Sequence, residues 1–196
     1  MQGKANADLG PFAGHGLAFA ASRNLFGYGS VLMNVLVLGV GNVLLSDEGV
    51  GVRVVEALVE RFDLPAGVEV VDGGTSGMDM LDMIGGRDHL ILVDAVRSAG
   101  GPGCIVRLSG DEVPAFFRTK ISPHQLGISD VLAALRLLEK EPKGITLIGV
   151  QPLDLRTSLE LSPPIAAKVE RLVEMVVDEL ASLGFTVRPK PAEHTA

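Results

Sequence analysis

The sequence has little of the chemistry that would cross-link it covalently or anchor it in a membrane. Its single cysteine, Cys104, cannot form an internal disulfide and lacks the CxxC spacing of a structural zinc site. No run of residues approaches the roughly 18 apolar positions that a membrane-spanning helix needs. These absences favour a folded domain that is not inserted in a membrane, in a reducing compartment that we expect to be the cytoplasm.

An excess of positive charge is also missing, because 24 acidic residues outnumber 17 basic ones and the formal net charge is -7. Such a chain repels the phosphates of nucleic acids and of anionic membranes, so neither is expected as its main partner. The 196 residues are 47% hydrophobic, which is enough for one domain with a substantial core. The sequence shows no internal repeat, no low-complexity tract and no sign of a second domain.

Residues 1–32 differ from the rest of the chain, since scattered glycines interrupt short apolar pieces without a steady period. Those pieces are too short for the apolar region of a secretory signal. The segment is either a poorly ordered leader, or it precedes a true translation start at Met33, which is the interpretation that we favour. We therefore expect an N-terminal extension over 1–32, a folded domain over 33–185 and a C-terminal tail over 186–196.

The segment VLVLGVGNVLLSDEGVGVR, residues 35–53, organises the prediction of the fold. Its apolar first residues are typical of a central parallel strand that is buried on both faces. Gly39 and Gly41 predict a tight turn, after which Ser46 and Asp47 are candidate N-caps of a helix with regularly spaced valines. A strand, a turn and a helix in this order begin a βαβ unit.

Further strands and helices alternate along the chain, which predicts a mostly parallel sheet covered by helices on both faces. Two of the predicted strands end on an acid, Asp72 and Asp94. Over residues 110–120 we expect a loop that packs its own phenylalanines rather than a partner-binding patch. The predicted strands cover 67–72, 89–94 and 144–150, with a weaker one over 105–108. Helices are predicted over about 78–84, from Ser122 and Pro123, and from Pro163 to Gly184.

Sheets of this kind bind ligands outside the carboxyl ends of their strands, at the point where the strand order reverses. If the first strand lies between the second and the third, the turn after Gly41 meets Asp72 and Asp94 at this edge. The three segments together then form the predicted site.

A dinucleotide-binding site is the first alternative to consider, because Gly39 and Gly41 match the opening of its fingerprint. The third small residue of that fingerprint is replaced by Leu44. Asp47 and Glu48 occupy the helix start where a pyrophosphate would bind, and their charges would repel it. Nucleotide binding is therefore disfavoured.

The acids at this edge are candidate metal ligands. Glu48 or Asp47, at a helix N-terminus, is stabilised in the charged form that binds a metal, although both could simply complement the helix dipole. Asp94 closes an apolar strand at the edge where sites form, which favours a role in binding. Asp72 has the same placement, but the Gly-Gly-Thr that follows makes a turn-capping role equally reasonable.

His124 completes a possible ligand set. A histidine near a helix start is often structural, but the helix dipole there favours the neutral imidazole that coordinates metals. Glu48, Asp94 and His124 would together supply two carboxylates and one imidazole and leave room for water. This set, without a thiolate, suits a borderline divalent ion such as nickel or zinc.

The motifs LGVGNVLLSDEGVGVR, DGGTSGMDML, RDHLILVDAV and KISPHQLG occur in this order and resemble the hydrogenase maturation endopeptidases, most closely those of uptake-type nickel-iron hydrogenases. The resemblance runs from about Met33 to near Gly184. It implies a single-domain, three-layer α/β/α sandwich around a twisted, mostly parallel sheet. It also implies that the Glu of the DE pair, the Asp after the third strand and the His of PHQ bind metal, and these are Glu48, Asp94 and His124.

The resemblance further implies one cleavage, which removes the C-terminal extension of the hydrogenase large-subunit precursor after nickel insertion. In this scheme the three ligands bind nickel that the substrate carries, and other divalent ions could occupy the site in vitro. We expect a nearby carboxylate or a metal-bound water to attack, with Asp94, Asp72 or Glu48 as the catalytic base. A non-catalytic nickel-binding chaperone is the alternative, whereas a generic zinc peptidase is disfavoured because the HExxH pattern is absent.

Overall fold

The computed structural model describes residues 33–118 and 123–191, with the backbone alone at Arg118 and from Pro123 to Leu126. Its main sheet contains β1 (Val35–Val40), β3 (Val68–Gly74), β4 (His89–Ala95), β5 (Ile105–Ser109) and β6 (Gly144–Val150). The strand order is β3-β1-β4-β6-β5, and only the pairing of β5 with β6 is antiparallel among these five strands. The predicted mostly parallel sheet is confirmed, and so is the position of the first strand between the next two.

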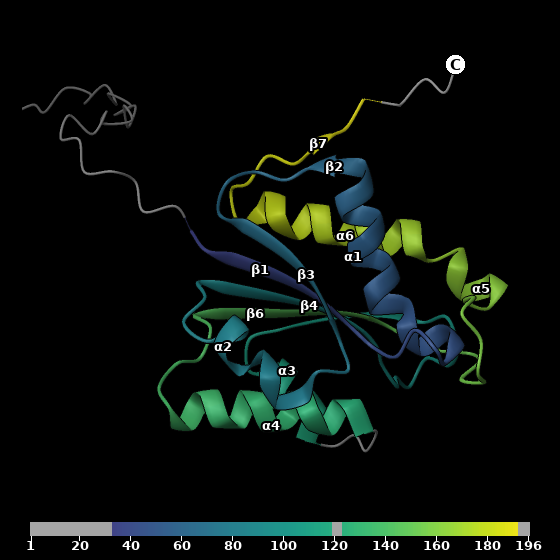
Figure 1. The fold of residues 1–196 in the computed structure, drawn as a ribbon, viewed down its shortest axis with the longest axis horizontal. Coiled ribbons are helices and arrows are strands. Elements are labelled where there is room, and N and C mark those ends of the chain that lie inside the picture. Colours follow the sequence, from purple (N-terminus) through teal and green to yellow (C-terminus); the bar gives the residue numbers. More distant parts are fainter. Residues whose placement is uncertain (1–32, 119–122, 192–196) are drawn as a thin grey trace, which may run out of the picture. The chain divides into compact units, whose positions relative to one another are not determined.

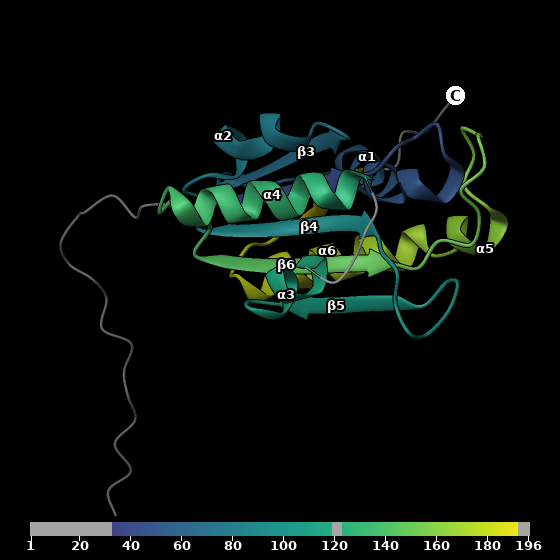
Figure 2. The same ribbon diagram turned by 90° about the horizontal axis from the view of Figure 1, so that it is seen from below.

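Helices cover both faces of the sheet, as Figures 1 and 2 show. The helices α1 (Val50–Arg61) and α6 (Val169–Ser182) pack on one face. On the other face lie α2 (Leu81–Ile84), α3 (Glu112–Arg118) and α4 (Pro123–Leu137). The described residues thus form the expected three-layer α/β/α arrangement.

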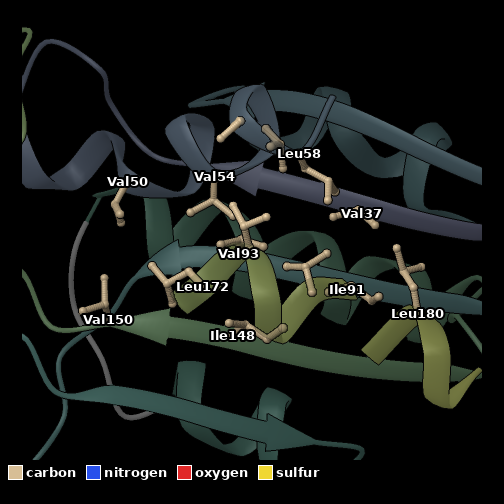
Figure 3. Close-up of a cluster of buried hydrophobic side chains, with 14 of the residues drawn as sticks. Val37, Val50, Val54, Leu58, Ile91, Val93, Ile148, Val150, Leu172 and Leu180 are labelled. Atoms are coloured by element: carbon tan, nitrogen blue, oxygen red, sulfur yellow. The ribbon is translucent and has the colours of Figure 1, made fainter. Parts of the chain in front are cut away.

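Two hydrophobic clusters hold these layers together, one on each face of the sheet. They arise because successive side chains of a strand point to opposite faces, and each fully buried aliphatic side chain contributes roughly 1.5–3 kcal/mol. On the side of α1 and α6, the buried strand residues are Val35, Val37, Ile91, Val93, Ala95, Ile148 and Val150, some of which are labelled in Figure 3. On the side of α2, α3 and α4, they are Leu36, Leu38, Val40, Leu90, Leu92 and Leu147.

The segment over 110–120 was expected to be a loop, and this prediction is wrong because it contains α3. The backbone N–H of Ser109, the last residue of β5, donates to the carboxylate of Glu112, the first residue of α3 (3.2 Å), and this hydrogen bond ties the start of the helix to the end of the strand. Phe117 is buried and packs edge-on against Phe116, with ring centroids 5.6 Å apart. The phenylalanines therefore do pack against each other, but they do so from a helix.

The C-terminal part of the chain follows the prediction more closely. The predicted helix from Pro163 to Gly184 is interrupted once, into α5 (Pro163–Ala166) and α6. Part of the expected tail forms β7 (Arg188–Pro189), which pairs antiparallel with β2 (Phe62–Asp63). No helix in the described ranges combines the length and apolar character needed to cross a membrane. The expected extension over 1–32 and the predicted cap Ser122 lie outside the described residues.

A buried polar network joins α6 to the sheet. Glu179 of α6 is only 7% exposed. Its carboxylate accepts hydrogen bonds from the Thr146 hydroxyl (2.8 Å) and from Nε and Nη2 of Arg107 (3.0 and 2.6 Å). Because the Thr146 hydroxyl gives its proton to Glu179, it accepts from Nε2 of His89, 3.0 Å away, and this fixes the tautomer of that imidazole.

His89 makes the stability of the fold depend on pH. Burial lowers its pKa below the ordinary value of 6.5, the Glu179 carboxylate opposes this shift, and the Arg107 guanidinium adds to it. Between the lowered pKa and 6.5, the unfolded chain binds a proton that the folded protein does not, so stability rises with pH across this window.

We therefore expect the free energy of unfolding to fall as the pH drops below 6.5. In a His89→Gln variant, the part of this fall that His89 causes disappears, while the contribution of the carboxylates remains. Urea denaturation of both proteins over a series of pH values measures the difference between their stabilities. A difference that stays constant from pH 7 to the acid range would contradict the role given to His89.

Candidate functional site

The candidate site lies at the carboxyl edge of the parallel strands. Gly39 near the end of β1 is in register with Asp72 of β3 on one side and with Val93 of β4 on the other. Asp94 follows Val93 and is fully buried. The structure thus places the two strand-ending acids on either side of β1, as the strand order required.

The turn that carries Glu48 packs against the ends of these strands. This turn is η1 (Ser46–Gly49), a single turn of 3-10 helix that lies against β4. A Cβ at Gly41 would lie 1.8 Å from the carbonyl oxygen of Glu48, and Gly41 has a φ of +133°. A Cβ at Gly51 would lie 2.2 Å from the carbonyl oxygen of Val93. Only glycine at both positions lets the turn bring Glu48 this close to the strand that ends in Asp94.

Asp72 has the geometry of a turn residue. Its side chain is exposed, and its Oδ1 accepts the backbone N–H of Gly74 at 2.8 Å. This hydrogen bond stabilises the turn in which Gly74 takes a φ of +47°. The contact supports turn capping, and a catalytic role for Asp72 stays a prediction.

His124 is the second residue of α4, as predicted, and only its backbone is described. The first turns of α4 pack against η2 (Gly77–Met80), since a Cβ at Gly127 would lie 3.1 Å from the Cα of Gly77. Figure 2 shows α4 beginning at the same end of the sheet at which β4 and β6 end. Among the described side chains, no three His, Cys, Asp or Glu residues are close enough to hold a metal. The set of Glu48, Asp94 and His124 therefore stays a prediction.

Asp47 does not cap the helix that follows it. The prediction that Ser46 or Asp47 is an N-cap is wrong, because neither side chain makes a capping hydrogen bond to η1 or α1. The fully buried Asp47 carboxylate instead accepts four hydrogen bonds from the loop after β6. The donors are the backbone N–H groups of Leu153 (2.9 Å), Asp154 (2.8 Å) and Ser162 (2.7 Å) and the Ser162 hydroxyl (2.8 Å).

The loop of residues 153–162 is tied to η1 at further points. Leu45 and Ser158 form a parallel bridge, and the Ser46 hydroxyl donates to the carbonyl of Glu160 at 2.9 Å. Between the loop and η1 lies an open cavity of about 770 Å³, whose lining includes Ser46 and Leu153. A space large enough for several residues of a peptide therefore borders the turn that carries Glu48.

This architecture matches a known family of peptidases. The family model described as hydrogenase maturation protease matches residues 52–179. The chain belongs to the hydrogenase maturation protease family. It is 49% identical over 163 residues to the hydrogenase 2 maturation protease of Escherichia coli (strain K12), and the aligned region covers 83% of this chain and 99% of that protein. It is also 43% identical to the hydrogenase expression/formation protein HupD of Rhodobacter capsulatus, over 78% of this chain and 74% of that protein.

Solved structures agree with this assignment of the protease. The hydrogenase maturating endopeptidase HybD from E. coli superimposes with a TM-score of 0.78 at 49% identity and covers 81% of this chain and 98% of that chain. The NiFe hydrogenase maturation protease HybD from Thermococcus kodakarensis superimposes with a TM-score of 0.63 at 30% identity, over 76% and 99% of the two chains. The predicted family, fold class and peptidase activity are therefore confirmed.

Replacing Asp47 tests its role as the acceptor that holds the loop. We expect Asp47→Ala to lower the free energy of unfolding by about 2–4 kcal/mol, because four buried donors lose their acceptor. Asp47→Asn keeps one acceptor oxygen and should lose less. Urea denaturation measures both variants, with Asp154→Ala as a control that removes an acid engaged with the exposed Arg156. An Asp47→Ala protein as stable as the wild type would show that these hydrogen bonds contribute nothing.

Replacing Gly51 tests the close approach of α1 to the strand ends. Alanine normally stabilises a helix by about 1 kcal/mol relative to glycine. At this position its Cβ would meet the backbone oxygens of Val93 and Val40 at 2.2 and 2.4 Å, so we expect Gly51→Ala to destabilise the protease by about 1–3 kcal/mol. Thermal or urea unfolding gives the sign of the change, and a stabilised variant would contradict the packing described.

Proposed function

We propose that this peptidase removes the C-terminal extension of a nickel-iron hydrogenase large-subunit precursor after nickel has been inserted, in the cytoplasm. Glu48, Asp94 and His124 bind the nickel that the precursor carries, so the ion belongs to the substrate. Cleavage then depends on prior metal insertion, because a precursor without nickel lacks the group that the three side chains recognise. The observation that carries the proposal is the convergence of the Glu48 turn and the end of β4 at one edge of the sheet in a chain of this family.

The chemistry of the three side chains supports this role. Two carboxylates and an imidazole suit a borderline divalent ion such as nickel. Asp94 is the next-to-last residue of a strand that is buried from Leu90 onward, and Glu48 is held by the tight turn at Gly41, so both carboxylates come from rigid elements. Preorganised ligands bind a metal without paying for their own ordering at the moment of binding.

In the hydrolysis itself, a water molecule adds to the scissile carbonyl and the C–N bond then breaks. One carboxylate of the site accepts the proton of the water, and the new amine of the released extension takes up a proton. Glu48 and Asp94 are the acids placed for this step, and Asp72 is the third candidate. Nickel held by the same residues would position the end of the precursor against them.

The reaction is tested by incubating the protein with the large-subunit precursor, with and without nickel, and measuring the mass of the precursor. We expect shortening only with nickel. We expect each of the variants Glu48→Gln, Asp94→Asn and His124→Ala to slow processing at least about 100-fold. Loss of an outer-shell partner of a metal already lowers activity by up to about 100-fold, and these three residues are proposed to bind the metal directly.

Glu174→Gln serves as the control, because Glu174 is an exposed acid on α6 that pairs with Arg171 of the same helix. It should process the precursor at the wild-type rate. Full processing by all three site variants would overturn the assignment of the ligands. A precursor that binds the wild-type protein but keeps its mass would indicate the nickel-binding chaperone instead.

A further inference from the structure

Exposed leucines concentrate beside the candidate site. In the described part of the chain, nine large hydrophobic side chains are exposed, and four of these are leucines next to η1 or in the loop after β6. Leu44 precedes η1, and Leu153, Leu155 and Leu159 belong to the loop, with exposed fractions between 47% and 64%. We call these four residues the leucine surface. Exposing several large apolar side chains on neighbouring segments is costly unless a partner covers them.

Backbone hydrogen bonds join the two segments that carry the leucine surface. The N–H of Ser158 donates to the carbonyl of Leu44 (3.0 Å), and the N–H of Ser46 donates to the carbonyl of Ser158 (2.9 Å). The N–H of Asp47 donates to the carbonyl of Asp154 at 3.1 Å, which adds to the four bonds that the Asp47 side chain accepts. The leucines are thus presented on an ordered backbone, so a partner that contacts them loses little affinity to ordering of the loop.

Charge on this loop is largely neutralised. The guanidinium of Arg156 donates to both carboxylate oxygens of Asp154, and these hydrogen bonds lower the pKa of Asp154 to about 2. A second arginine, Arg53 of α1, donates from Nη2 to the backbone carbonyl of Leu159 at 3.0 Å. Glu160 is the one other charged residue of the loop and is exposed, so the leucines lie beside a paired Asp154 and Arg156 and a single further acid.

The leucine surface is also continuous with the candidate site. Leu44 and Glu48 flank the same short stretch of chain, and the loop residues contact Ser46 and Asp47 within η1. The open cavity of about 770 Å³ lies between the loop and η1 and is lined in part by Leu153. The leucine surface therefore adjoins, through η1, the segment that carries Glu48.

We propose that the leucine surface is the docking surface for an apolar segment of the hydrogenase large-subunit precursor, next to the segment that is cleaved. This inference rests on the proposed function and adds a second recognition element to it. Glu48, Asp94 and His124 bind the precursor through its nickel, whereas the leucine surface contributes binding free energy whether or not nickel is present. Binding and cleavage therefore respond differently to changes at the two places.

The experiment compares two double variants in the cleavage of the nickel-loaded precursor. We expect Leu155→Ser/Leu159→Ser to raise KM about tenfold and to leave kcat within about twofold of the wild type, because the contact is made before and during the reaction alike. The control is Leu137→Ser/Leu138→Ser, which removes two leucines that are 86% and 52% exposed at the far end of α4. This control should leave both kinetic parameters unchanged.

A second measurement uses the wild-type protein and needs no substitution. Hydrogen exchange at the backbone amides of residues 154–160 should slow when the precursor without nickel is added, because docking does not require the metal. Faster or unchanged exchange together with normal cleavage would overturn the docking surface.

The outcomes separate this inference from the proposed function. If the wild-type protein does not shorten the precursor, the proposed function fails, and the docking surface fails with it. If the wild-type protein cleaves normally and the Leu155→Ser/Leu159→Ser variant has the same KM, the docking surface alone is overturned. It is also overturned if these substitutions convert a dimer of the protein into a monomer without changing KM, because a second copy then covers the leucines.

Discussion

The close approach of η1 and α1 to the ends of β1 and β4 is the constraint on which the rest of the structure depends. Backbone atoms lie where a side chain at either glycine would be, since the turn fills the space beside Gly41 and the carbonyls of Val93 and Val40 fill the space beside Gly51. In nucleotide-binding folds, glycines at such a turn leave room for a phosphate. Here the carbonyl of Glu48 fills the space beside Gly41. The same glycines therefore serve to hold an acid at the strand ends.

Asp47 and Glu48 are adjacent in the sequence, but their side chains lie in different environments. The Asp47 side chain is fully buried and fixes the loop of residues 153–162, whereas the Glu48 side chain is partly exposed at the site. One short turn thus positions a candidate ligand and organises the loop that carries most of the leucine surface. Movement of the turn would alter both at once, so the proposed metal recognition and the proposed precursor docking would be linked through the backbone of η1.

The ends of the strands can be predicted from the sequence, because an apolar run that finishes on an acid, such as the one ending at Asp94, is visible in the local sequence. The sequence predicts α3 badly, since that helix is short and contains Pro114, although proline is tolerated in a first helical turn. The acids Asp111 and Glu112, at the start of the helix, were the available signal. The role of Asp47 has no such signal, because its partners lie 106 to 115 residues away and depend on the tertiary fold.

Burial alone does not identify the functional acids of this protein. Three carboxylates are buried in the described residues, those of Asp47, Asp94 and Glu179. Burying a carboxylate costs several kcal/mol unless donors or cations compensate it. For Asp47 the compensation is the loop after β6, and for Glu179 it is Arg107 and Thr146, so both acids join elements of the fold to one another. Asp94 differs in position, because it lies next to the last residue of β4, against the turn of Glu48, at the edge where parallel sheets bind ligands. Its place along the strand, rather than its depth, is what makes it a candidate acid of the site.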